Sequence, residues 1–192
     1  MEAIILASSS PRRRELLTQA GIPFVVMPGD VDEENADISG TPAQKAQQLA
    51  YMKAMDVARG KSGIILGADT IVVCDDEIFG KPADADDARR MLRKLSGREH
   101  LVITGIALIN TSTGRVSTGY ETTKVRFSSL SDREIEAYIE SGEPYGKAGA
   151  YAIQGRAALF VEGLDGCYSN VVGLPLRRLY RLLQDFGIEA YG

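Results

Sequence analysis

The sequence has little of several residue types that define special classes of protein. Its 192 residues include one histidine, two cysteines and no tryptophan. Two cysteines, Cys74 and Cys167, are too few for the disulfide framework of a small secreted domain. Cys74 continues the apolar run Ile71-Val72-Val73, which predicts that its side chain is buried filler. One histidine and two distant cysteines also leave a structural zinc site without a ligand set.

Long hydrophobic runs and an excess of basic charge are missing as well. No apolar stretch approaches the roughly 20 residues that cross a bilayer, and Met1 to Leu6 lack the basic lead of a signal peptide. We therefore expect a cytoplasmic protein with no membrane partner. The formal net charge of −4 gives no basic footprint for stable nucleic-acid binding, so local clusters must bind any anion.

What the sequence does contain is a mixture of helical and strand patterns. Strands are expected near residues 3–7, 64–66, 71–73, 101–109, 116–127 and 159–161. Helices are expected near residues 11–20, 42–59, 85–95 and 131–140, and from 175 onward. Ser10, Thr41 and Ser131 are the expected N-caps, and Gly67-Ala68-Asp69-Thr70 is expected to interrupt the strands on either side of it.

This mixture predicts an α/β fold with a mixed, curved β-sheet flanked by helices. The chain contains no internal repeat, low-complexity tract or linker. We expect residues 1–192 to form a single unit, and leave open whether it has two lobes around a central cleft.

The first anion signal follows the first expected strand. Ser8-Ser9-Ser10-Pro11-Arg12-Arg13-Arg14 opens a helix with positive charge, which opposes the helix macrodipole. A bound phosphate would make this arrangement favourable, because helix N-terminal amides, hydroxyls and arginines all favour it. A solvated basic patch is the alternative. The arginines point in different directions on a helix, so we do not expect all three to reach one ligand.

Two charged residues fall inside apolar patterns. Lys53 lies on the apolar stripe of the second helix, so it must extend to solvent, pair with a carboxylate or point into a polar cavity. Asp69 is the acid within the apolar stretch from Gly63 to Val73. A buried aspartate accepts backbone hydrogen bonds, or binds a metal or a water.

Two loops could complete a phosphate site. Gly80-Lys81-Pro82 carries a lysine on an extended segment. The loop from Gly29 to Glu34 concentrates acids, which on composition alone indicates a solvated loop. Magnesium bound to a triphosphate needs only one or two protein carboxylates, so Asp69 with Glu33 could suffice.

A glycine-rich segment runs from Gly142 to Gly155. It lacks the P-loop pattern and the dinucleotide fingerprint, and a structural loop is one interpretation. The other is that Tyr151 and Gln154 read a base, by stacking and by hydrogen bonds to its edge.

Together these segments resemble the Maf family, in the family's order and over nearly the whole chain. The matching pieces are Leu6-Ala7-Ser8-Ser9-Ser10-Pro11-Arg12-Arg13, Gly67-Ala68-Asp69-Thr70, Gly80-Lys81-Pro82, Leu95-Ser96-Gly97-Arg98, Lys147-Ala148-Gly149-Ala150-Tyr151-Ala152-Ile153-Gln154-Gly155 and Val171-Val172-Gly173-Leu174-Pro175. The piece that begins at Lys147 is similar to the subgroup that acts on dTTP and UTP.

The resemblance implies a Maf/ITPase-like architecture and a hydrolase that cleaves dTTP, UTP and modified pyrimidine nucleotides to the monophosphate and pyrophosphate. It implies Asp69 as the proton acceptor and as a metal ligand with Glu33. The implied substrate-binding residues are Ser8, Arg12, Arg13, Lys53, Thr70, Lys81 and Gln154, of which Arg12, Thr70 and Gln154 are specificity positions. The resemblance also implies Mg²⁺ or Mn²⁺ as a cofactor and a homodimer.

Two departures and two rival functions remain. Gly146 stands where the family commonly has Asp, and Ala152 where Gly is usual, which could alter base selection or rate. One rival is a house-cleaning pyrophosphatase for other non-canonical nucleotides. The other is a non-catalytic nucleotide-binding regulator of cell division, which would have no need of an acid at Asp69.

Overall fold

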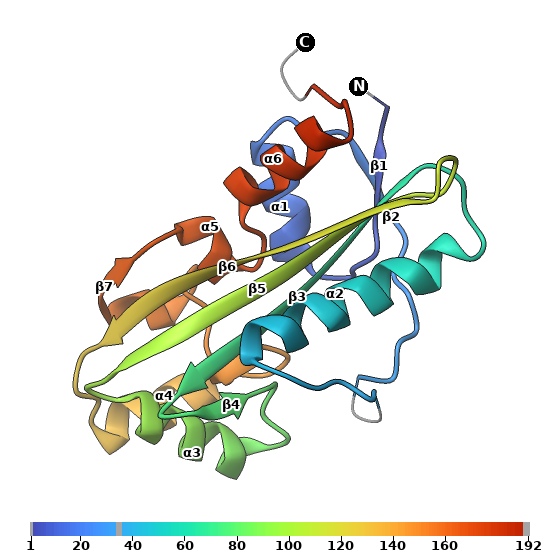
Figure 1. Cartoon of the computed structure of the whole chain (residues 1–192). Helices are drawn as coiled ribbons and strands as arrows, with labels where there is room; N and C mark the ends of the chain where they lie inside the picture. The colour runs from blue at the N-terminus through green and yellow to red at the C-terminus, as the bar shows by residue number, and fades with distance from the viewer. Residues whose placement is uncertain (1, 34–35, 190–192) are drawn as a thin grey trace. The chain divides into compact units, whose positions relative to one another are not determined.

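The computed structural model describes residues 2–33 and 36–189. Its strands are β1 (Ile4–Leu6), β2 (Phe24–Val26), β3 (Ile64–Cys74), β4 (Glu77–Phe79), β5 (Glu99–Asn110), β6 (Arg115–Phe127) and β7 (Val161–Asp165). Its helices are α1 (Pro11–Gln19), α2 (Pro42–Ala58), α3 (Ala85–Leu95), α4 (Asp132–Glu140), α5 (Tyr168–Val172) and α6 (Leu176–Asp185), with 3₁₀ turns η1 (Ala148–Ala150) and η2 (Arg156–Leu159) (Figure 1).

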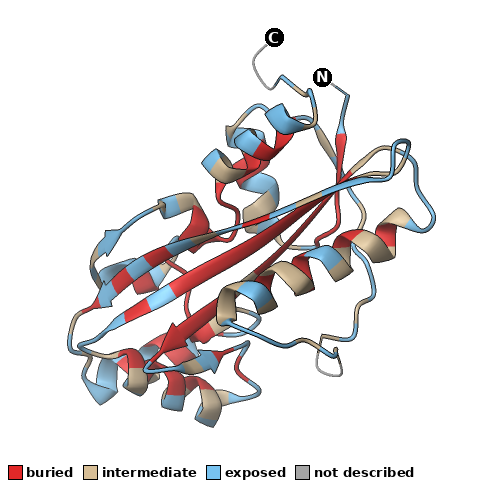
Figure 2. Ribbon diagram, viewed as in Figure 1, coloured by how far each residue is buried: buried red, intermediate tan, exposed pale blue. Residues whose placement is uncertain are grey.

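The strands form one mixed sheet in the order β2-β1-β3-β5-β6-β7, and β4 pairs with β3 outside this path. β1 is parallel to β2 and to β3, whereas β4 and β7 pair antiparallel with β3 and β6. Most residues of β3 and β5 are buried (Figure 2). The predicted α/β class with a mixed sheet flanked by helices is confirmed.

Contacts divide the chain into two compact units. The first comprises Met1–Asp69, Thr104–Glu121 and Gly173–Gly192, and the second comprises Thr70–Ile103 and Thr122–Val172. Strands β3, β5 and β6 therefore contribute residues to both units. We describe each unit by itself.

The first unit has a core of small and branched side chains where α2 packs on the sheet. The buried members of this cluster are Ile5, Ala7, Ala50, Ala54, Val57, Ile65, Ala107 and Ile109. Helix α2 begins at Pro42 after the predicted N-cap Thr41, whose side chain and that of Gln44 form a reciprocal capping box. This cap fixes the start of the helix that carries Lys53.

The second unit has an aromatic core. The rings of Phe127, Tyr138, Tyr151 and Phe160 and the imidazole of His100 meet edge to face, with centroids 4.8 to 6.1 Å apart. Such geometry places positive ring edges on negative ring faces. These residues come from β5, β6, α4 and the segments around η1 and η2, so the cluster fixes the glycine-rich segment to the sheet.

Two local predictions are wrong, and some local features were not predicted. β3 runs unbroken through Gly67 to Thr70, because Gly67 serves close packing by α2 rather than a chain break. Leu159 lies in η2 and is 86% exposed, so the strand expected at residues 159–161 starts only at Val161. The Ser10 hydroxyl caps no backbone amide of α1, although Ser10 is the N-cap residue as expected. Sequence patterns also gave no sign of β2 or α5, which are short.

Two expectations from composition can be compared with the structure. Cys74 is 1% exposed, which confirms that it is a buried side chain. Among the described residues no helix is both long and apolar enough to cross a bilayer.

Candidate functional site

An ion cluster in the first unit joins three predicted site residues. The Lys53 ammonium donates a 2.6 Å hydrogen bond to Oδ1 of Asp69, and it lies 3.0 Å from Oε1 of Glu33. The side chains of Lys53 and Asp69 are only 16% and 9% exposed, whereas that of Glu33 is 36% exposed. Of the alternatives open to Lys53 on its apolar stripe, the structure shows pairing with carboxylates.

Close packing of α2 on β3 brings Lys53 to Asp69. A Cβ atom at Gly67 would lie 2.0 Å from the carbonyl oxygen of Ala50 and 2.9 Å from the backbone nitrogen of Ala54. Only glycine therefore permits this approach. Lys53 lies between these two alanines in the sequence, and Asp69 lies two residues after Gly67 on the same strand.

The acidic loop is fixed to the same helix. The backbone amide of Asp30 donates a 2.9 Å hydrogen bond to Oδ2 of Asp56, which lies one helical turn after Lys53. This anchor holds the loop along α2 and places Glu33 within reach of the ammonium. Glu33 is therefore part of an ion cluster rather than of a solvated loop, while its neighbour Glu34 lies outside the described residues.

Arg13 forms a second anchor in the first unit. Its Nε donates a 2.8 Å hydrogen bond to the carbonyl oxygen of Gly173, and its Nη1 donates a 3.0 Å hydrogen bond to Oγ of Ser8. Ser8 is 8% exposed, and its Oγ also accepts a hydrogen bond from the backbone amide of Ser10. Arg13 thus joins the start of α1 to the segment that leads into α6.

The charges of the ion cluster and of Arg13 lie within electrostatic range of each other. Burial lowers the pKa of Arg13, the carboxylate of Asp69 raises it, the guanidinium of Arg12 lowers it, and Glu33 raises it. The structure therefore gathers six of the predicted site residues in one neighbourhood. They are Ser8, Arg12, Arg13, Glu33, Lys53 and Asp69.

The other predicted residues, Thr70, Lys81 and Gln154, belong to the second unit. Thr70 follows Asp69 on β3 and is half-buried, and Lys81 is exposed directly after β4. The carbonyl of Gly80 accepts a 3.0 Å hydrogen bond from the amide of Gly149, so the lysine loop lies beside the glycine-rich segment.

Gln154 is exposed on a turn whose surroundings are fixed by three hydrogen bonds. Tyr151 Oη and His100 Nε2 are 2.8 Å apart, the amide of Ala152 donates to the hydroxyl of Tyr138 at 3.2 Å, and the amide of Arg156 donates to Glu143 Oε2 at 2.9 Å. These bonds hold the backbone on both sides of Gln154. A fixed turn with an exposed amide is suited to reading the edge of a base.

The interpretation of Tyr151 as a base-stacking ring is wrong. The residue is 5% exposed, and its ring packs edge to face on Phe127 with centroids 4.8 Å apart. Its sequence neighbours suggested an accessible loop, but the ring belongs to the aromatic core of the second unit. Tyr151 therefore supports the segment that carries Gln154.

The donor set fits a divalent cation held with a triphosphate. Carboxylate oxygens of Glu33 and Asp69 converge on a single nitrogen atom, so both could approach a single metal ion. Mg²⁺ is commonly held by one or two carboxylates together with substrate phosphates. No cluster of three or more His, Cys, Asp or Glu side chains suited to a metal occurs among residues 2–33 and 36–189.

Comparison with known proteins identifies the family. The family model described as "Maf-like protein" matches residues 3–186. The chain belongs to the Maf family.

Relatives and solved structures extend this assignment. A protein from Ruminiclostridium cellulolyticum named dTTP/UTP pyrophosphatase is 57% identical over 96% of each chain. One of the same name from Pelotomaculum thermopropionicum is 50% identical over 97% of this chain and 98% of that one. A HAM1 protein from Coxiella burnetii shares the fold, with a TM-score of 0.53 at 15% identity, covering 96% of this chain and 100% of the other.

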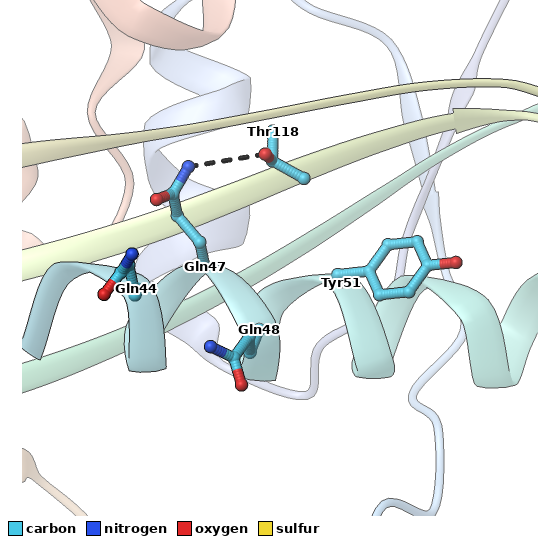
Figure 3. Close-up of a pocket in the computed structure, with 5 residues that line it drawn as sticks. All are labelled: Gln44, Gln47, Gln48, Tyr51 and Thr118. Atoms are coloured by element: carbon cyan, nitrogen blue, oxygen red, sulfur yellow. Dashed lines mark hydrogen bonds between the residues drawn. The ribbon is translucent and has the colours of Figure 1, made fainter. Parts of the chain in front are cut away.

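This Maf protein also has a surface pocket, whose lining residues differ in chemistry from those of the ion cluster. Its volume is about 270 Å³, and Figure 3 shows that its lining comes from α2 and β6. The lining residues are Gln44, Gln47, Gln48, Tyr51 and Thr118. It contains no charged side chain and none of the predicted site residues, so it lacks the cations that a triphosphate requires.

Sequence reasoning missed the residues that hold the site in place. Asp56 anchors the acidic loop, and the carbonyl of Gly173 accepts from Arg13 across 160 residues of sequence. A backbone carbonyl leaves no sequence signal, although Gly173 lies within a piece that matched the Maf family. Asp56 could have been found from its spacing of three residues from Lys53, which places both on the same side of α2.

Proposed function

We propose that this protein hydrolyses nucleoside triphosphates to the nucleoside monophosphate and pyrophosphate, with dTTP, UTP and modified pyrimidine nucleotides as substrates. The observation that carries the proposal is the buried carboxylate of Asp69 in contact with Lys53, within electrostatic range of Arg13. A protein that only binds phosphate gains nothing from an acid there. The names of the relatives supply the substrate class and the reaction.

The reaction is a displacement in which water breaks the linkage between the α- and β-phosphates. The new bond joins the water oxygen to phosphorus, and the bridging oxygen leaves with pyrophosphate. Asp69 accepts the proton of the attacking water. Its Oδ1 is the oxygen that accepts the hydrogen bond of Lys53 in the structure, and we assign the proton of the water to Oδ2.

Catalysis of this reaction depends on positioning and on neutralising the charge that develops on the leaving group. Arg12, Arg13, Lys53 and Lys81 are the cations that we assign to the phosphates, with the Ser8 hydroxyl as a further donor. The guanidinium of Arg13 is fixed by Gly173 and Ser8, so its charge is already oriented before substrate binds. Such preorganisation avoids reorganisation during the reaction.

Glu33 and Asp69 would hold Mg²⁺ or Mn²⁺ together with oxygens of the triphosphate. A divalent ion at this position supplies positive charge that stabilises the phosphate oxygens. The chain's own residues orient the water, accept its proton and bind the phosphates.

Base selection is assigned to Gln154, with Thr70 and Arg12 as further specificity positions. Gln154 is exposed on its fixed turn, and its amide can both donate to and accept from a base edge. Gly146, where the Maf family commonly has Asp, has a φ of +73°, and a Cβ atom there would have no neighbouring atom within 4 Å. Its replacement of Asp therefore changes charge near the segment without leaving a packing defect.

The proposal includes three further points. Residues 1–192 form a single Maf-type unit, two copies of the chain form a homodimer, and the protein is cytoplasmic. Cys74 and Cys167 are free thiols, which suits a reducing compartment. Sedimentation velocity of the purified chain measures the oligomeric state, and a monomer at all concentrations would remove the dimer from the proposal.

A substrate panel with product analysis tests the reaction. The protein is incubated with Mg²⁺ or Mn²⁺ and with dTTP, UTP, CTP, ITP or a modified pyrimidine triphosphate. We expect the highest kcat/KM for dTTP and UTP, with equal amounts of monophosphate and pyrophosphate. Orthophosphate as the first product would indicate a phosphatase, preference for ITP would indicate the rival house-cleaning activity, and binding without turnover would indicate a regulator.

A further inference from the structure

We infer that Lys53 is a tethered counter-ion that occupies the metal position of the nucleotide-free protein. In this view the divalent ion binds there only when a triphosphate draws the lysine onto its phosphates. The inference rests on the proposed function and concerns the order in which that site is filled. It makes Lys53 a positioning residue that couples metal binding to nucleotide binding.

The geometry gives the first reason. The ammonium nitrogen lies 2.6 Å from Oδ1 of Asp69 and 3.0 Å from Oε1 of Glu33. A Mg²⁺ ion held by these two oxygens would lie about 2.0–2.1 Å from each, in the space that the ammonium occupies. Lysine and metal therefore exclude each other at this point.

The charge of the neighbourhood gives the second reason. Lys53 already offsets negative charge of Glu33 and Asp69, and Arg12 and Arg13 carry further positive charge in the same neighbourhood. A divalent ion added to this cluster would meet repulsion from three cations in a partly buried site. A triphosphate removes that penalty, because its negative charge exceeds the charge that the metal brings.

The construction of the helix gives the third reason. The backbone of α2 at Lys53 is fixed, because Ala50 and Ala54 are in close contact with Gly67. The four-carbon side chain of lysine is flexible, and its ammonium accepts many geometries. Lys53 can therefore leave the carboxylates for a phosphate without any movement of α2.

Binding of Mn²⁺ without nucleotide tests the inference. The full chain, Lys53→Met and the control Lys45→Met are titrated with Mn²⁺ and followed by electron paramagnetic resonance. Lys45 lies on the same helix, so its variant removes the same charge at a distance from the carboxylates. We expect Lys53→Met to bind Mn²⁺ about tenfold more tightly than the unchanged chain, or more, because no ammonium competes for the carboxylates of Glu33 and Asp69. The Lys45→Met variant should bind as weakly as the full chain.

Unchanged or weaker Mn²⁺ binding by Lys53→Met would overturn the inference. The double variant Lys53→Met with Glu33→Gln should lose the added affinity, and retention of tight binding would show that the metal sits elsewhere. If Lys53→Met does not fold alone, Lys53→Gln keeps a donor for Asp69 and gives the same readout. If Mn²⁺ restores cooperative unfolding to a Lys53→Met variant that does not fold alone, the inference is supported. If Mn²⁺ does not restore it, the inference is overturned.

The two proposals can fail separately. The titration needs no turnover, so tighter Mn²⁺ binding by Lys53→Met stands even if the substrate panel shows no hydrolysis. Conversely, hydrolysis of dTTP with unchanged Mn²⁺ binding by the variant would leave the proposed reaction intact and remove the counter-ion role.

Discussion

Gly67 on β3 lies so close to α2 that a Cβ atom there would be 2.0 Å from the carbonyl oxygen of Ala50. The obstacle is helix backbone, which cannot rotate away as a side chain could. The position of α2 over β3 depends on the absence of a side chain at Gly67, and so does the contact of Lys53 with Asp69.

We therefore expect Gly67→Ala to push α2 away from β3. Overpacking of this kind costs about 1–3 kcal/mol of the free energy of unfolding, and kcat should fall because Lys53 and Asp69 shift from the positions in which they act on the substrate. Urea unfolding and steady-state kinetics with dTTP measure the two effects. The control is Gly60→Ala, since no atom lies within 4 Å of a Cβ at that position. Normal stability and turnover in Gly67→Ala would show that the close approach is not needed.

Asp69→Asn tests the proton acceptor. The amide keeps the size of the side chain but cannot accept the proton of water, so kcat should fall by about 10²–10⁴-fold, the usual contribution of a general base. Circular dichroism should show an unchanged fold, and a dTTP analogue that resists hydrolysis should still bind. Near-normal turnover would remove Asp69 from this role.

The sequence predicted the fold class, and it marked two buried charges that lie in contact, but it did not predict the local structure around them. Charged residues inside apolar patterns, Lys53 and Asp69, could be recognised because burial of an unpaired charge is costly, and the structure pairs them. The continuity of β3 could not be recognised, because glycine normally weakens a strand and its reason here lies on α2. Tyr151 was misjudged for a similar reason, since its partners His100 and Phe127 are distant in sequence.

The anchor role of Arg13 predicts that lysine cannot replace it. Its Nε and Nη1 donate to separate acceptors, the Gly173 carbonyl and Ser8 Oγ, whereas a lysine has one nitrogen at the end of its chain. Arg13→Lys should lower the free energy of unfolding by about 1.5–3 kcal/mol, the range for a hydrogen bond to a charged group. Urea titration measures this loss. Arg14→Lys, an exposed change on the same helical turn, should be neutral, and equal stability of the two variants would contradict the anchor role.

Gln154 is expected to control base selection rather than folding. Its side chain is exposed, while the backbone around it is held by Tyr138 and Glu143. Gln154→Ala should therefore leave the melting temperature unchanged but lower the ratio of kcat/KM for dTTP over CTP by about 10-fold, as for loss of one or two hydrogen bonds. Gln184→Ala, on the exposed side of α6, controls for the loss of an amide. An equal loss of activity on every base would mean that Gln154 does not read the base.

His100 gives the protein a defined sensitivity to acid. Burial lowers its pKa from 6.5 to about 4, and its Nε2 lies 2.8 Å from the hydroxyl of Tyr151. Below pH 6.5 the unfolded chain takes up a proton that the folded chain refuses, so stability is lost as the pH falls from the unfolded pKa towards the folded one. The difference between the two pKa values corresponds to about 3 kcal/mol.

Urea unfolding between about pH 7 and about pH 4.5 measures the acid sensitivity. Replacing both partners, as His100→Phe with Tyr151→Phe, removes the titrating group without leaving the tyrosine hydroxyl unpaired. The free energy of unfolding of this double variant should fall less steeply over the same interval than that of the unchanged chain. Equal slopes would mean that the pKa of His100 is the same in the folded and unfolded chain, which its burial among Phe127 and Tyr151 argues against.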